Sequence, residues 1–170
     1  MITLGIDPGV SGGYTFLFDK HVECRKFTSA NEFLEVTQNI WFENIGESKE
    51  GFNINPDINI WIERVHASPQ MSPKAAFTFG ENFGAIQGLV LSVFGNMVNF
   101  VRPQVWQHGI EGLKGIQGPE RKRLLRAYAM ATYPEVGKLT LATADSLLIA
   151  KYGENEIRNY PELKQEKIEI

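Results

Sequence analysis

Three carboxylates stand at places in this sequence where an ionised side chain is unusual. Asp7 follows an apolar run in which Ile2, Leu4 and Ile6 alternate with small or polar residues, and Glu63 ends the strongly apolar segment 58–63. Asp145 lies inside the almost entirely apolar segment 140–152. A charged group in such surroundings needs a partner or a cation. Neighbouring carboxylates repel each other unless a cation or a proton neutralises them. For Asp7 alone, a solvated carboxylate that caps a turn is an equally good explanation.

The chemistry that suits such a set is metal-assisted phosphoryl transfer. Ligands that are all oxygen, with no Cys or His cluster, favour Mg²⁺ or Mn²⁺ over zinc. Two such ions about 3.5–4 Å apart can hold the attacking and leaving oxygens of an in-line displacement. The three acids are therefore candidate metal ligands and candidate catalytic residues.

The elements that must position these acids follow from periodicity. Alternating apolar residues predict strands over 2–7, 14–18 and 21–27, which would form an antiparallel meander with turns at Pro8-Gly9 and Gly12-Gly13. Segment 58–63 reads as a central strand covered on both faces, able to lie beside the first strand and bring Glu63 next to Asp7. A fifth strand is expected over 96–101. Helices are expected over 30–43, 74–95, 119–132 and 140–152, with a short one from Arg102-Pro103, and a surface loop over 44–57.

Basic residues suggest where a polyanion would bind. The first half of helix 119–132 carries Arg121, Lys122, Arg123 and Arg126, although cations near a helix N-terminus oppose its macrodipole. A polyanionic partner would explain them, and a solvated helix face is the alternative. Further candidate phosphate contacts are His66, Lys74 and Lys114.

The predicted long helix carries a row of small residues spaced by four, namely Ala76, Gly80, Gly84 and Gly88. Each glycine costs about 1 kcal/mol of helix propensity relative to alanine. Close approach of another element, either within the chain or from a second subunit, would offset that cost.

Composition bounds the rest. The 170 residues, with 43% hydrophobic and 22% charged residues, predict one globular domain over 1–153 followed by a charged tail over 154–170. The net charge of −3 argues against a protein that coats nucleic acid but permits a local basic groove. No secretory signal and no membrane-length apolar run is evident, and the single Cys24 fits a reducing, cytoplasmic location.

Five segments, taken in order, resemble the RuvC-type Holliday junction resolvases of the phage and bacterial branch. They are Gly5-Ile-Asp7-Pro8-Gly9, the block 62–67 (IERVHA), the glycine-containing block 79–88, Arg102-Pro103-Gln104-Val105-Trp106, and the block 144–153 (ADSLLIAKYG). The resemblance implies a ribonuclease H-like α/β fold: a five-stranded mixed sheet, its first three strands antiparallel, flanked by helices. It also implies a homodimer that cleaves four-way or branched DNA with Mg²⁺ or Mn²⁺, two ions per site, and it assigns Asp7, Glu63 and Asp145 as metal ligands.

One departure from the family pattern bears on activity. The family has a fourth acid three or four residues before the last one, where this chain has Ala142 and Leu141. A junction-binding protein of the same fold with weak or no cleavage is therefore the main alternative. A nuclease of the same fold acting on RNA–DNA hybrids is another. The Asp7 turn also resembles the phosphate loop of actin-like ATPases and sugar kinases, but those need a second lobe for which this chain has no room.

Overall fold

A computed structural model describes residues 1–9, 11–45, 58–66, 71–95 and 98–160. Most of the expected loop over 44–57 and the last ten residues of the expected tail therefore lie outside the described residues. Within the described ranges no helix is long and apolar enough to cross a membrane.

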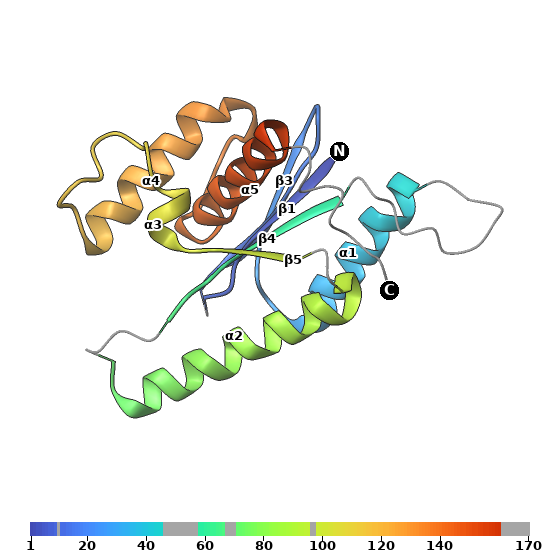
Figure 1. Ribbon diagram of the computed structural model, residues 1–170, viewed down its shortest axis with the longest axis horizontal. Coiled ribbons are helices and arrows are strands. Elements are labelled where there is room, and N and C mark those ends of the chain that lie inside the picture. Colours follow the sequence, from blue (N-terminus) through green and yellow to red (C-terminus); the bar gives the residue numbers. More distant parts are fainter. Residues whose placement is uncertain (10, 46–57, 67–70, 96–97, 161–170) are drawn as a thin grey trace.

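A five-stranded mixed sheet forms the centre of the fold (Figure 1). Its strands are β1 (Ile2–Asp7), β2 (Gly13–Leu17), β3 (Val22–Lys26), β4 (Ile58–Glu63) and β5 (Val98–Val101), in the spatial order β3-β2-β1-β4-β5. The first three strands pair antiparallel, whereas β4 pairs parallel with both β1 and β5. The predicted meander, and the placement of segment 58–63 beside the first strand, are confirmed.

Two helical layers cover the sheet. One contains α1 (Ala30–Ile45) and α2 (Pro73–Phe94), and the other contains α3 (Pro103–Trp106), α4 (Gly118–Thr132), the short η2 (Pro134–Val136) and α5 (Leu141–Asn159). Figure 1 shows α1 and α2 on one side of the sheet and α4 and α5 on the other. The two hydrophobic cores correspond to these layers: Ile86, Val90 and Phe94 of α2 pack in one, and Leu125 of α4 with Leu147 of α5 in the other.

The first strand is buried on both faces, although alternation of apolar with small or polar residues is typical of a strand with one buried face. Ile2, Leu4 and Ile6 face the α1/α2 core, while α5 packs directly over the small residues between them. A Cβ atom added at Gly5 would lie 2.3 Å from both the Ala150 nitrogen and the Ser146 carbonyl oxygen. Glycine is required there because only a residue without a side chain lets α5 approach so closely.

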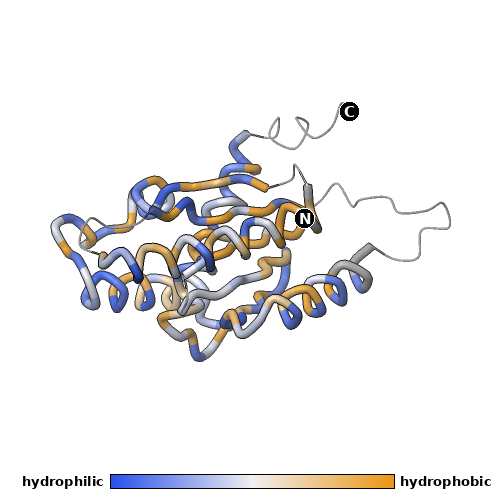
Figure 2. The backbone as a smooth tube through the Cα atoms, turned by 90° about the horizontal axis from the view of Figure 1, so that it is seen from below, coloured by the Kyte–Doolittle hydropathy of each residue, from blue (hydrophilic) through white to orange (hydrophobic). Residues whose placement is uncertain are grey.

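Hydropathy explains the layering. In Figure 2, α1, which leads into the grey segment at the right, alternates between hydrophobic and hydrophilic residues along its turns. An amphipathic helix of this kind buries one stripe against the sheet and exposes the other. In α1 the buried stripe includes Phe33 and Ile40.

The last helix is longer than its sequence pattern predicts. α5 continues to Asn159, so residues 154–159 of the expected tail are helical. Arg158 pairs with Glu154 one turn earlier, and Ile157 is buried. One buried apolar residue per turn is enough to keep this polar stretch in the helix.

Candidate active site

Asp7 is held at the carboxyl end of β1 by the turn that follows it. Its side chain is only 7% exposed, and the Gly9 N–H donates to its Oδ1 at 3.1 Å. The turn is tight, because the Gly12 N–H also donates to the Gly9 carbonyl at 2.8 Å. This leaves the second oxygen of Asp7 without a hydrogen bond among the described residues.

Glu63 ends β4 next to Asp7. The parallel register pairs Ile6 with Ile62, so the two acids follow at the same edge of the sheet. The indole N–H of Trp106, on α3, donates to Glu63 Oε1 at 2.9 Å. Trp106 is buried, so this hydrogen bond fixes one oxygen of Glu63 and leaves the other available.

Asp145 lies in the helical layer that contains α4 and α5, in the second turn of α5. Thr140 caps that helix through a reciprocal capping box with Thr143, which fixes where the first turn begins. The side chain is 9% exposed although it neighbours Ala144 and Leu147 in the core. No hydrogen bond or ion pair holds its carboxylate within the described part of the chain.

The three carboxylates influence one another electrostatically. Burial raises the pKa of Glu63 to about 7, the charges of Asp7 and Asp145 add to the rise, and the Trp106 N–H opposes it. Burial, followed by the charge of Asp7, raises the pKa of Asp145 to about 6. Burial also raises the pKa of Asp7, against the Gly9 hydrogen bond. Three carboxylates whose pKa values are raised in this way would be stabilised in their ionised form by a bound cation.

The three carboxylates are ligands of the type that a hard divalent ion prefers, but they are not close enough together to coordinate one. Each acid has at least one carboxylate oxygen free of hydrogen bonds, and oxygen is the ligand that Mg²⁺ and Mn²⁺ prefer. Within the described residues, however, no three Asp, Glu, His or Cys side chains gather tightly enough to hold a metal as they stand. The structure also has Ala142 one turn before Asp145, where a fourth acid would help to close the site.

Lys122, on α4, is the predicted basic residue whose charge acts on these acids. Its positive charge opposes the rise in pKa of Asp7, Glu63 and Asp145 alike. Its side chain is exposed, as is that of its neighbour Arg123.

Two other predicted phosphate contacts, Arg121 and Arg126, form hydrogen bonds within the protein. The Arg121 guanidinium makes four, to the Gln107 side chain twice and to the carbonyls of Leu113 and Ile116. It therefore holds the loop between α3 and α4 in place, and its role as a phosphate contact stays a prediction. Arg126 donates from Nε to the Leu139 carbonyl at 2.6 Å, which ties α4 to the segment before α5.

The remaining predicted contacts are exposed and separate from the acids. His66 follows β4, Lys74 lies in the first turn of α2 and Lys114 lies in the loop between α3 and α4. Among the described residues no hydrogen bond or ion pair links any of the three to Asp7, Glu63 or Asp145.

Sequence reasoning missed the role of Trp106. The sequence places Trp106 just after the start of the expected short helix, and in the structure it is buried there, but nothing in the sequence identifies it as the donor to Glu63. The available signal is the position of Trp106, one short turn after the strand that neighbours the one ending in Glu63.

No protein-family model matches this sequence, and neither does any curated protein. The solved structures that are similar include two of Thermus thermophilus RuvC. One, Thermus thermophilus RuvC in complex with a Holliday junction substrate, has a TM-score of 0.61 and 16% identity, covering 94% of this chain and 97% of that one. The other, Thermus thermophilus RuvC, has a TM-score of 0.52 and 17% identity, covering 94% and 96%. Together with the strand order, these similarities show that the chain has the ribonuclease H-like fold of RuvC.

Proposed function

We propose that this protein is a metal-dependent endonuclease of the RuvC type, from the phage and bacterial branch, that cleaves four-way or branched DNA as a homodimer. The observation that carries the proposal is the convergence of Asp7, Glu63 and Asp145 from β1, β4 and α5 at one edge of a RuvC-like fold. The similar RuvC structure that contains a Holliday junction suggests the class of DNA.

Each residue has a distinct part in this proposal. Asp7, Glu63 and Asp145 would hold Mg²⁺ or Mn²⁺, which supplies Lewis-acid activation of the attacking water and stabilises charge on the leaving oxygen. Trp106 orients Glu63 through its hydrogen bond. Asp7 is oriented by the Gly9 N–H, so it presents its other oxygen in a fixed direction. Lys122 places a positive charge beside the acids, where a phosphodiester would lie.

A second candidate function is junction binding with weak or no cleavage. Ala142 and Leu141 stand where the resemblance leads us to expect an acid, and the three carboxylates are not gathered closely enough to hold a metal as they stand. A protein with this site would keep its DNA-binding surface and lose efficient hydrolysis.

One experiment separates the two. The purified protein is incubated with a labelled four-way junction or a matched linear duplex, in Mg²⁺, Mn²⁺ or EDTA. We expect symmetric nicks near the branch point that disappear in EDTA and in Asp7→Asn. Asp19→Asn is the matched control, because Asp19 is exposed and, among the described residues, pairs only with the chain N-terminus. Tight binding without nicks in either metal would favour the second function, and neither binding nor nicks would overturn both.

For the homodimer we propose the outer face of α2 as the contact surface. Of the two partners that the sequence left open for the glycine row, the second subunit is favoured, because a Cβ atom at Gly80, Gly84 or Gly88 would meet no atom of the described residues within 4 Å. Phe77 and Leu91 extend the same face and are 68% and 38% exposed. These five positions are symmetric about Gly84, large at both ends and small between, as two antiparallel copies related by a two-fold axis require.

Sedimentation velocity tests this surface. Gly84→Arg is expected to give a monomer, whereas Thr78→Arg, on another exposed side of the same helix, should leave the dimer intact. A wild-type protein that is monomeric at micromolar concentration, or a Gly84→Arg protein that stays dimeric, would contradict the assignment.

A further inference from the structure

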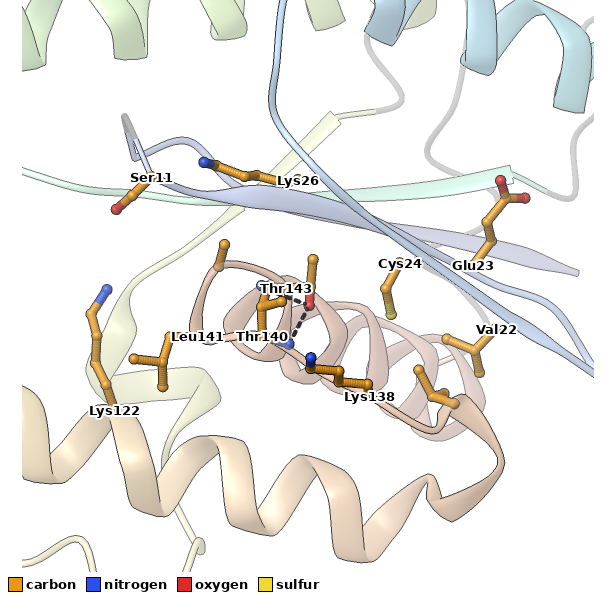
Figure 3. A pocket seen from close by; sticks show the side chains of 12 residues that line it. Ser11, Val22, Glu23, Cys24, Lys26, Lys122, Lys138, Thr140, Leu141 and Thr143 are labelled. Carbon is orange, nitrogen blue, oxygen red and sulfur yellow. Dashed lines mark hydrogen bonds between the residues drawn. The ribbon is translucent and has the colours of Figure 1, made fainter.

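A pocket of about 930 Å³ lies between β3 and the start of α5. It runs from Ser11, in the turn after Asp7, along β3 to the segment between η2 and α5 (Figure 3). Lys26, Lys122 and Lys138 line it from three different parts of the fold: the end of β3, the first half of α4 and the segment before α5. We refer to it as the lysine-lined pocket.

The positive charge of this pocket is not balanced within the described part of the protein. None of the three lysines forms an ion pair there, since the ion pairs involve only the N-terminus, Arg25 and Arg158. The one acid in the lining, Glu23, is paired with Arg25. Three unpaired cations around one cavity, in a chain with net charge −3, indicate an anionic ligand.

The first turn of α5 adds hydrogen-bond donors to the same wall. The Thr140 hydroxyl accepts from the Thr143 N–H, but the N–H groups of Leu141 and Ala142 have no partner among the described residues. Free N–H groups at a helix N-terminus bind anions. An acidic side chain at Leu141 or Ala142 would repel an anion in the pocket. In this chain both residues are apolar, so that repulsion is absent.

Lys122 connects this pocket to the candidate active site. It lines the pocket, and its charge acts on Asp7, Glu63 and Asp145. A polyanion held at the carboxylates and continuing past Lys122 would therefore enter the lysine-lined pocket.

We propose that the lysine-lined pocket binds a backbone phosphate of the DNA. This phosphate lies on the same strand as the phosphate positioned for cleavage and is its neighbour. The inference rests on the proposed function and adds a binding site to it. Lys26 and Lys138 supply the charge and the α5 N-terminus supplies the hydrogen bonds, so the contact is independent of base sequence. It fixes the position of the strand relative to Asp7, Glu63 and Asp145.

The salt dependence of DNA binding tests the proposal. Fluorescence anisotropy of a labelled four-way junction in EDTA, at several KCl concentrations, gives the slope of log affinity against log salt. Lys26→Ala and Lys138→Ala are each expected to reduce that slope by about one and to weaken binding roughly three- to tenfold near 0.1 M salt. Lys26→Arg should restore the slope, since it keeps the charge.

Lys20→Ala is the matched control, because Lys20 is exposed and lies outside the pocket lining. Wild-type slopes in both pocket variants, with wild-type protein binding the junction, would overturn this proposal alone. No binding by the wild-type protein to either junction or duplex would overturn the proposed function as well. A thermal shift with inorganic pyrophosphate that the two substitutions abolish, while the junction slope stays unchanged, would assign the pocket to a small free anion instead.

Discussion

At the scale of single residues, Trp106 offers the cleanest way to disturb the candidate site. Its indole N–H stabilises the ionised form of Glu63, whose pKa burial has already raised to about 7. Trp61 is a natural comparison: it is also buried, but its indole N–H has no hydrogen-bond partner in the described structure.

We expect Trp106→Phe to weaken Mn²⁺ binding at pH 7 about five- to tenfold in calorimetry without DNA. Loss of the donor raises the pKa of Glu63 in the metal-free protein, so a proton must more often leave before the metal can bind. The affinity should recover near pH 9. Trp61→Phe should leave the affinity unchanged, and equal losses in both variants would show that the effect comes from packing.

Ala142 gives the second test at this scale. It lies one helical turn before Asp145, on the same side of α5. We expect Ala142→Asp to bind Mn²⁺ about tenfold more tightly than the wild-type protein in calorimetry without DNA, because it adds a fourth oxygen ligand. Ala142→Asn is the control for size, and unchanged affinity in Ala142→Asp would show that this position does not face the metal.

At the scale of elements, the decisive contact is that of α5 with β1. Glycine at position 5 lets the helix lie directly on the strand, and the same helix carries Asp145. The distance between Asp145 and Asp7 therefore depends on a packing contact made by neither of them.

Gly5→Ala should destabilise the fold by about 3 kcal/mol in urea unfolding, because its Cβ atom would overlap backbone atoms of α5 that cannot rotate away. Cleavage should fall as well, since α5 must move away from β1. Gly84→Ala is the contrasting substitution in open space, and it should stabilise a monomer by up to about 1 kcal/mol. A neutral effect of Gly5→Ala would contradict the packing described here.

Periodicity was sufficient to predict these elements but not all of their contacts. The five strands, the antiparallel meander and the main helices follow from local pattern, because each depends on the spacing of apolar residues along one or a few neighbouring segments. The mixed character of the sheet is implied only by the resemblance to the RuvC-type resolvases. The roles of Arg121 and Trp106 depend on segments brought together by folding. The exposed glycine row of α2 shows the same limit, since a pattern of small residues indicates close packing without identifying the partner.

At the scale of the whole molecule, the buried acids make stability depend on pH and on metal. Glu63 and Asp145 have pKa values of about 7 and about 6, above those of the unfolded chain, so the folded state binds more protons between about pH 4 and 7. The free energy of unfolding therefore decreases as pH rises through that range.

We expect the melting temperature of the metal-free protein to be lower at pH 7.5 than at pH 5.5, by an amount reflecting on the order of 1–3 kcal/mol. Mg²⁺ or Mn²⁺ should reverse the loss, with a larger effect at pH 7.5. Asp145→Asn should reduce the pH dependence in EDTA, and Glu63→Gln should remove most of what remains. A melting temperature that rises between pH 5.5 and 7.5 in EDTA would contradict the electrostatic description of the site.

The placement of α5 over β1 has a consequence for synthesis on the ribosome. β1 leaves the exit tunnel long before α5, yet its inner face and Asp7 are covered only when α5 arrives. The nascent chain can form the β1–β3 hairpins early but must keep the α5 side of the sheet exposed until most of the described chain has been made. Assembly of the three acids is thus a late event in translation, because it follows the emergence of α5.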